Sequence, residues 1–300
     1  MRSYSNGLAQ YQIWTKDTAS ANQSDGAGNA NDVYRKICAM KDWPFLEQLR
    51  TLSTTASTQF TTLPYDCDLV RSVYVIPTGS SFRYTPKEAP SREYWDQLNL
   101  SSFTSDIPEW YFVFAGQIGL WPTPASTSNT IGIIQKSRVI DLSVADLTSS
   151  TVTSIANGAT TVTLSGGLTT LMAGMYIRIT YTGGAATTGD GVWYQIASVT
   201  SSTVLELTRK YGGTTIAAAT AACTIGQMPL LPEAFHDTPW KGASAMYWEK
   251  EMDPRGASFR ASYDEDILNL VRSYSSPTTG MVLDDGEDVD ILNPNLTIRI

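Results

Sequence analysis

The longest helical pattern of apolar and polar positions lies near the end of the chain, between Met228 and Tyr274. Pro229 and Pro232 come first, and proline can open a helix because its φ angle is already helical. The stretch Asp253-Pro254-Arg255-Gly256 interrupts the run, since proline and glycine break or restart helices. The pattern then resumes as a stripe with helical spacing, formed by Phe259, Tyr263, Ile267, Leu270, Val271 and Tyr274.

A second helical pattern lies far upstream and consists of Val33, Tyr34, Ile37, Cys38 and Met40. An apolar stripe on a helix needs another apolar surface to cover it. We therefore predict that the two ends of the chain pack together as a small helical core. The upstream helix is expected to start near Asn31 and to end near Asp42, because the residue before Pro44 disfavours the helical conformation.

The residues before this helix give weaker signals. The segment Leu8–Trp14 is compatible with a short helix or a strand. Residues 17–31 are rich in Ser, Asn, Gly and Ala, which predicts a loop or a disordered arm.

From Leu49 onward, short extended runs replace the helical period. Trp110–Phe114 is the strongest strand candidate and is predicted to be central. Ile118–Trp121 and Thr130–Ile134 are expected to continue the same sheet. Pro90–Asp96 is interpreted as one helical turn with Ser91 as its cap.

A long stretch with few charges follows, and between Ser149 and Glu206 it carries only Arg178 and Asp190. Short alternating strands and paired glycines recur along it, which is typical of a small antiparallel sandwich or barrel. The predicted strands are Thr151–Ile155, Thr160–Leu164, Met175–Tyr181, Val192–Val199, Thr203–Thr208 and Ala222–Ile225.

These patterns predict an α+β fold in which β-structure is inserted into a helical core. The expected parts are a helical core from residues 1–50 and 227–275, a β-rich region from 51–140, an inserted β-sandwich or barrel from 141–226, and an extended C-terminal arm from 276–300.

The C-terminal arm joins an acidic cluster to an alternating segment, Asn295–Ile300. The EF-hand pattern fails here, because Gly286 follows Asp285 directly and the alternation of ligands is lost. A solvated arm, or one that faces a basic partner, fits better than a loose calcium site. A lone terminal strand becomes useful when it adds to a sheet edge. The candidate interface residues are Asp284, Asp285, Glu287, Asp288, Asp290, Leu296, Ile298 and Ile300.

Charge, apolar stretches and cysteine spacing argue against several classes of function. The formal net charge of −8 and the absence of any basic run argue against a sheath around nucleic acid. The N-terminus lacks the apolar core of a signal peptide, and no apolar stretch is long enough to insert into a membrane. The cysteines Cys38, Cys67 and Cys223 share no metal or redox spacing, so we expect buried thiols in a reducing compartment.

Candidate catalytic chemistry is sparse. The one histidine, His236, has no nucleophile-elbow sequence beside it and is expected to have a structural or capping role. The glycine pairs lack the lysine of a phosphate loop. Paired carboxylates of a glycosidase remain an option at Glu93 with Asp96, or Asp106 with Glu109, although a general acid needs a raised pKa. We predict no enzyme activity and no cofactor.

Four stretches nevertheless resemble the head-to-tail adaptor, or connector, proteins of tailed bacteriophages. They are Asp42-Trp43-Pro44-Phe45-Leu46, Leu63-Pro64-Tyr65-Asp66, Gly191–Val199 and Met228–His236. The resemblance covers roughly residues 33–274, and its motifs are structural rather than catalytic. The long β-module is larger than a minimal helical adaptor contains.

The resemblance implies a ring, commonly of twelve copies, that sits under the portal protein, seals the DNA channel and docks tail or nozzle proteins. DNA would pass through without specific binding, and the protein would be made in the host cytoplasm and reside in the neck of the virion. An alternative is a tail-tip or fibre-associated protein that binds host-surface carbohydrate through Tyr176, Tyr181, Trp193 and Tyr194. These aromatic side chains are equally compatible with a sandwich core, because Trp193 and Tyr194 should point to opposite faces of a strand and only one of them can be outside. A carbohydrate-active enzyme is a third and weaker alternative.

Overall fold

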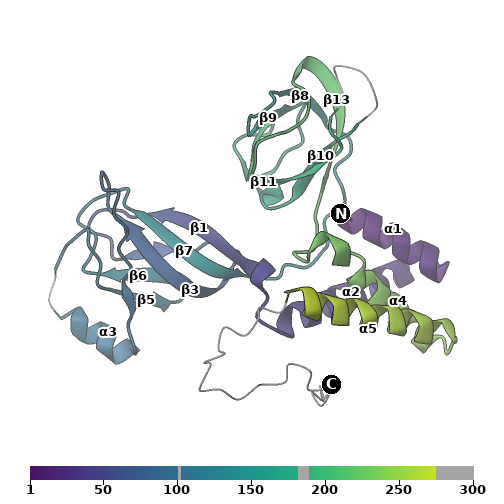
Figure 1. Cartoon of the computed structure of the whole chain (residues 1–300), viewed down its shortest axis with the longest axis horizontal. Coiled ribbons are helices and arrows are strands. Elements are labelled where there is room, and N and C mark those ends of the chain that lie inside the picture. Colours follow the sequence, from purple (N-terminus) through teal and green to yellow (C-terminus); the bar gives the residue numbers. More distant parts are fainter. Residues whose placement is uncertain (101–102, 182–188, 275–300) are drawn as a thin grey trace, which may run out of the picture.

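The computed structural model describes residues 1–100, 103–181 and 189–274, and for residues 218–220 the backbone alone. Three lobes meet near the N-terminus (Figure 1). We call them the helical lobe, the two-sheet lobe and the barrel. The fold is α+β, as predicted, with β-structure inserted between helices from the two ends of the chain.

The helical lobe contains α1 (Tyr4–Thr15), α2 (Ser20–Ala39), α4 (Thr238–Lys250) and α5 (Arg255–Tyr274). Its main core joins α2 residues such as Ile37 to the α5 stripe around Leu270, and both side chains are fully buried. The predicted packing of the two chain ends is therefore confirmed. Met40 is an exception, because it lies past the end of α2 and is 55% exposed.

The prediction of a loop or disordered arm at residues 17–31 is wrong, because α2 already begins at Ser20. Close packing stabilises this helix in spite of its low intrinsic propensity. A Cβ atom on Gly26 would lie 2.3 Å from the ring of Tyr11, so α1 and α2 approach each other closely there. Ala30 is buried in the same cluster as Tyr11. The ambiguous segment Leu8–Trp14 is part of helix α1.

The two-sheet lobe packs two small sheets face to face. The first has the order β1-β7-β3, formed by Glu47–Ser53, Thr130–Ser137 and Cys67–Ile76. The second has the order β2-β6-β5-β4, formed by Phe60–Thr62, Gln117–Trp121, Trp110–Phe114 and Lys87–Glu88. Apolar side chains from both sheets share one core. Helix α3 (Arg92–Leu98) begins at its predicted cap, because the hydroxyl of Ser91 accepts a hydrogen bond from the Tyr94 N–H.

The expectation that Thr130–Ile134 continues the sheet of Trp110–Phe114 is wrong. β7 is instead the middle strand of the other sheet and faces β5 and β6 across the core. Alternation of apolar residues shows that a strand has a buried face, but it does not say which strand lies beside it. β5 is an inner strand of its own sheet, as predicted.

The third lobe is a closed antiparallel barrel with the strand order β10-β11-β12-β9-β8-β13. Its strands are β8 (Thr151–Ile155), β9 (Thr161–Leu164), β10 (Tyr176–Ile179), β11 (Trp193–Val199), β12 (Val204–Leu207) and β13 (Ile216–Gly226). All six predicted strands are present, but β13 starts six residues earlier than the predicted Ala222. Short 3-10 turns at Pro44–Leu46, Thr170–Met172 and Glu233–Phe235 complete the described elements. None of the described helices combines the length and hydropathy needed to cross a membrane.

Candidate assembly surfaces

The predicted interface residues Asp284, Asp285, Glu287, Asp288, Asp290, Leu296, Ile298 and Ile300 lie outside the described residues. The structure does show the surroundings of the last described residue. Tyr274, the last residue of α5, packs edge-on against Phe45 and Phe235 with ring centroids 5.7 and 6.3 Å away. Phe45 lies in the short turn that leads directly into β1. Tyr274, the last described residue, therefore lies close to the first residue of β1.

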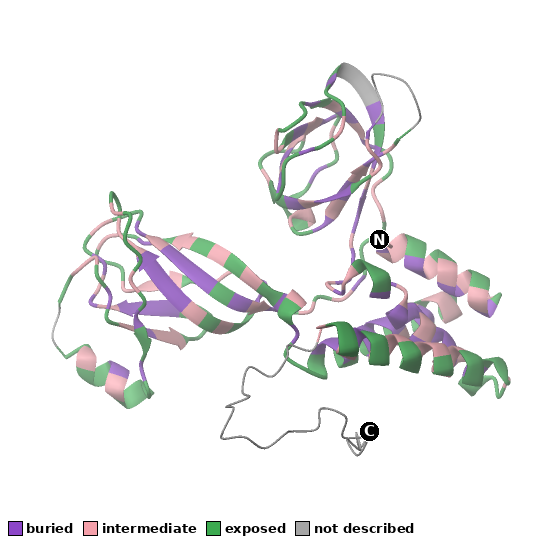
Figure 2. Cartoon of the chain, viewed as in Figure 1, coloured by how far each residue is buried: buried purple, intermediate pink, exposed green. Residues whose placement is uncertain are grey.

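Strand β1 forms one edge of the first sheet and pairs only with β7 among the described strands. The pairing runs through seven residues with no register shift. Burial alternates along β1 between exposed and intermediate (Figure 2). Leu52 faces the core between the sheets, whereas Leu49 points outward and is 57% exposed.

The outer face of this sheet carries an apolar row across its strands. Leu49 of β1 lies opposite Ile134 of β7, and both side chains are exposed. Farther along the sheet, the ring of Tyr74 covers Gly132, where a Cβ atom would lie 1.9 Å from the ring. Arg83 in turn stacks 3.8 Å above the ring of Tyr74. The Tyr74 end of the face is thus covered, while the Leu49 end is open.

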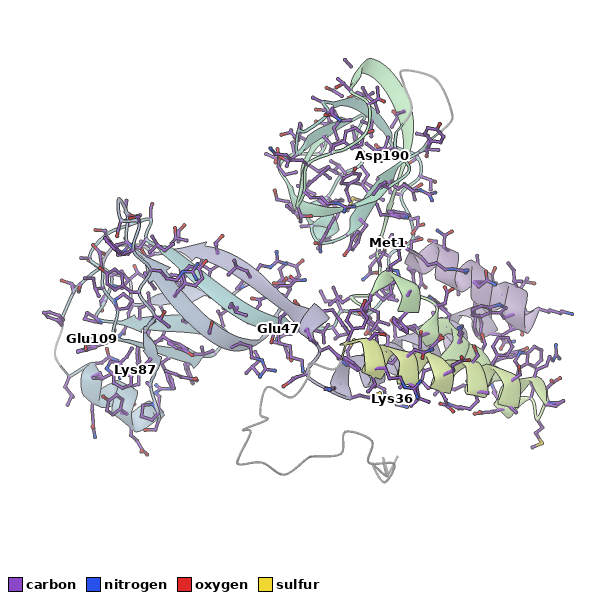
Figure 3. The ribbon with its side chains drawn as sticks, in the orientation of Figure 1. Met1, Lys36, Glu47, Lys87, Glu109 and Asp190 are labelled. Atoms are coloured by element: carbon purple, nitrogen blue, oxygen red, sulfur yellow. The ribbon has the colours of Figure 1, made fainter. Side chains whose placement is uncertain are left out.

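The N-terminus joins the barrel to the helical lobe (Figure 3), where Met1 lies between these two lobes, and Glu47 lies where the two-sheet lobe begins. The Ser3 hydroxyl donates to Asp146 at 2.6 Å, and the Tyr4 N–H donates to the Gln227 carbonyl at 2.8 Å. Asp146 lies on the segment that enters the barrel and Gln227 on the segment that leaves it. The first residues of the chain are therefore packed within the fold.

Further hydrogen bonds connect the barrel segments to the helices. The side-chain amide of Asn31 donates to the Leu142 carbonyl at 3.0 Å, and its oxygen accepts from the Leu142 N–H at 2.8 Å. The Gln227 side chain accepts from two backbone N–H groups of residues 143–144 and donates to the Asp141 carbonyl. The Asn31 bonds attach the segment that enters the barrel to α2, and the Gln227 bonds join the entering and leaving segments to each other.

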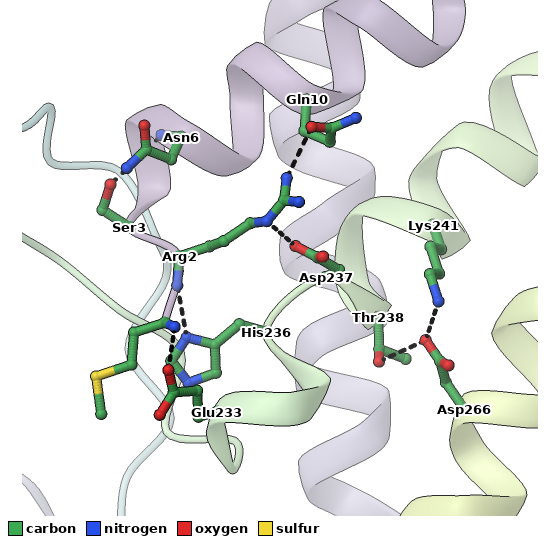
Figure 4. Close-up of polar contacts among 11 residues, drawn as sticks. Arg2, Ser3, Asn6, Gln10, Glu233, His236, Asp237, Thr238, Lys241 and Asp266 are labelled. Atoms are coloured by element: carbon green, nitrogen blue, oxygen red, sulfur yellow. Dashed lines mark hydrogen bonds and ion pairs between the residues drawn. The ribbon is translucent and has the colours of Figure 1, made fainter.

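His236 belongs to this junction (Figure 4). Its Nδ1 accepts from the Arg2 N–H at 3.1 Å, so Nδ1 carries no proton, and Nε2 donates to the Leu231 carbonyl at 2.9 Å. Burial lowers the pKa of His236, which keeps the imidazole neutral. The Arg2 guanidinium pairs with Asp237 at 2.7 Å and donates to Gln10. These contacts agree with the predicted structural role.

The paired carboxylates do not show the features of a glycosidase site. Asp96 forms an ion pair with Arg92. Burial pushes the pKa of Asp106 upward, but hydrogen bonds from Ser126 and Asn129 outweigh it, and the net pKa lies below its ordinary value. A general acid needs a raised pKa instead.

The cysteines are buried and unpaired with one another, as predicted, and burial raises the pKa of the Cys38 thiol to about 12. In the described part of the chain, no group of three or more His, Cys, Asp and Glu side chains is placed to hold a metal ion.

The aromatic residues considered for carbohydrate binding are mostly covered. Tyr194 points into the barrel core, and Trp193 is 8% exposed beneath the guanidinium of Arg178, 5.0 Å from its ring. The two rings therefore lie on opposite faces of the strand, as predicted, and an arginine covers the outward ring of Trp193. Tyr181 is exposed, and Tyr176 is partly buried.

The described surfaces thus include an open sheet edge at β1 with an exposed apolar face beside it. No curated protein matches the chain. The family model described as SU10 adaptor protein matches residues 3–282, which include all three lobes. The chain therefore belongs to the SU10 adaptor protein family, a family of bacteriophage adaptor proteins.

Proposed function

We propose that this adaptor assembles as a ring under the portal protein, where it seals the DNA exit channel and docks the tail. The observation that carries this proposal is the family match across residues 3–282. The ring would contain about twelve copies, the number common among the adaptors that the chain resembles. Its other partners would be tail or nozzle proteins, and its place would be the neck of the virion after synthesis in the host cytoplasm.

The junction of the three lobes supports this role. A subunit of a closed ring must present two surfaces at a fixed angle, because a variable angle would not close the ring. Hydrogen bonds from Ser3, Tyr4 and Asn31 fix the barrel segments on the helical lobe. The ion pairs of Asp42 with Arg71 and Lys136 connect the end of α2 to the first sheet.

Charge also fits a channel through which DNA slides. The chain carries a formal net charge of −8. A negative surface repels phosphate and so limits non-specific binding. We propose that the acidic residues Asp284, Asp285, Glu287, Asp288 and Asp290 face either the channel or a basic surface of the portal.

The alternating segment of the arm supplies the contacts of the assembly in this proposal. Leu296, Ile298 and Ile300 would pair with a neighbouring subunit or with the portal. Deleting residues 295–300 should weaken ring formation and portal binding, measured by mass photometry of the purified protein with and without portal. Unchanged assembly of the truncated protein would rule out this role of the arm.

A matched pair of variants tests whether assembly depends on the apolar side chains or only on the length of the arm. Replacing Leu296, Ile298 and Ile300 by Ser should reproduce the deletion. Replacing Thr297 by Ser and Arg299 by Lys should leave assembly unchanged, because these residues alternate with the apolar ones and face the other way in an extended segment.

A further inference from the structure

Strand β1 is the long unprotected sheet edge of the described structure. Proteins protect sheet edges with bulges, proline or very short strands, because an open edge pairs with other chains. β3, at the other side of the same sheet, has register shifts at Cys67/Leu69 and at Val70/Ser72. The outer strands of the second sheet, β2 and β4, have three and two residues, and the barrel is closed. β1 has seven residues and neither a bulge nor a proline.

The face beside this edge is also open. Leu49 is 57% exposed and lies opposite Ile134 on β7. A strand added beyond β1 would place its own side chains about 4.5–5.5 Å from those of β1. An apolar residue there would extend the row formed by Leu49 and Ile134 and shield it from water. The edge therefore favours an extended segment with apolar residues at every second position.

The C-terminal segment of the chain has this pattern. In an extended conformation, Leu296, Ile298 and Ile300 project from one face, and Thr297 and Arg299 from the other. No proline interrupts residues 295–300. The segment is thus matched in length and pattern to the edge of β1.

The length of the connection favours pairing between two copies. Tyr274 contacts Phe45, which precedes Glu47 by two residues, so a strand pairing with β1 of its own chain would need only a short link. Connections between neighbouring elements usually have about 2–6 residues. Residues 275–294 instead separate Tyr274 from the segment, and they can span roughly 65 Å when extended.

We propose that residues 295–300 of one copy add as a strand to the free edge of β1 in the adjacent copy. This inference rests on the proposed ring and names the surface that receives the arm. Leu296, Ile298 and Ile300 then lie on the face of Leu49, and each copy both donates a strand and accepts one. Such a head-to-tail contact closes around a ring.

Disulfide trapping between two proteins that each carry one added cysteine tests this pairing. One protein carries Thr51→Cys, an exposed outer-face position on β1, and the other carries Ile298→Cys. The variants Leu296→Cys and Ile300→Cys scan the register. Directly opposite residues of paired strands are close enough for a disulfide. The native cysteines are buried, and Asp68→Cys on the bulged edge of β3 is the matched control.

We expect a covalent dimer from mixed Thr51→Cys and Ile298→Cys proteins, and at least about tenfold less from Asp68→Cys with Ile298→Cys, as for random collision. A protein with both changes should give a ladder of linked chains. An intrachain bond alone would overturn the proposal in favour of pairing within one copy. Electron microscopy of the same samples distinguishes the proposed strand pairing from the proposed ring. Rings without any disulfide to β1 would overturn the pairing alone. The absence of rings would overturn the proposed function.

A second pair of variants needs no cysteine. Leu49→Lys should weaken ring formation about tenfold, since it places an unpaired charge in the apolar row at the edge. Leu69→Lys is the control, because Leu69 is 48% exposed on the bulged edge strand. Equal effects of the two changes would contradict a specific role of β1.

Discussion

The ring of Tyr274 meets the ring of Phe45 at an interplanar angle of 87°, with the centroids 5.7 Å apart. Phe45 also stacks on Trp43, which is buried and donates its indole N–H to the Ile37 carbonyl at 2.7 Å. Three segments thus converge here, namely the end of α2, the turn before β1 and the end of α5. This contact connects the helical lobe to the strand that we propose as the acceptor of the arm.

Packing of α5 is expected to dominate the stability of the helical lobe. Leu270 is fully buried between α5 and α2, so Leu270→Ala should lower the free energy of unfolding by about 2–5 kcal/mol through lost burial and a cavity. Leu268→Ala, two residues away at 48% exposure, should change it by less than about 0.5 kcal/mol. Urea unfolding measures both values. Similar losses for the two variants would mean that the stripe does not pack as described.

The N-terminal half of α2 allows a sharper comparison. Gly26→Ala should destabilise the protein by about 1–3 kcal/mol, because the new methyl group would overlap the ring of Tyr11. Gly28→Ala meets no atom within 4 Å and should stabilise α2 by about 0.5–1 kcal/mol through its helix propensity. Thermal unfolding shows whether each variant is more or less stable than the wild type. Destabilisation by Gly28→Ala would contradict a helix at this position.

Helices α5 and α2 differ in how far the sequence predicts them. The stripe from Phe259 to Tyr274 predicted α5, because its apolar residues follow the helical period. Residues 20–31 have the composition of a loop, and they form a helix because Gly26 and Ala30 permit a close approach to Tyr11. The stability gained from this packing depends on the contact between α1 and α2. A pattern within either segment therefore does not predict it.

The sequence also does not predict that β1 is a free sheet edge. The alternation around Leu49 predicts a strand, but whether that strand is an edge depends on which strands lie beside it. The bulges of β3 and the regular register of β1 are properties of the pairing and are not visible in either strand alone. The arm, by contrast, is predicted from its own alternation and charge, and it lies outside the described residues.

Acid should weaken the junction of the lobes through His236. Burial lowers the pKa of the folded imidazole below its ordinary value of 6.5, so the unfolded chain binds more protons between these two values. Stability from this residue is therefore complete above pH 6.5 and declines as the pH falls through the lowered pKa. Urea unfolding between pH 7.5 and 5.5 should show this decline.

His236→Gln provides the control for the pH series, because glutamine does not titrate and still offers a donor and an acceptor. Its stability should depend less on pH than that of the wild type over the same range. The chain contains one histidine, so no second imidazole contributes. Parallel curves for the two proteins would show that protonation of His236 is not coupled to folding.

The most direct measurement of the central claim is electron microscopy of phage particles produced when this gene carries an early stop codon. An adaptor that seals the portal and docks the tail predicts heads that lack tails and leak DNA. Complete tailed particles that fail to attach to cells would contradict the account and would favour host recognition.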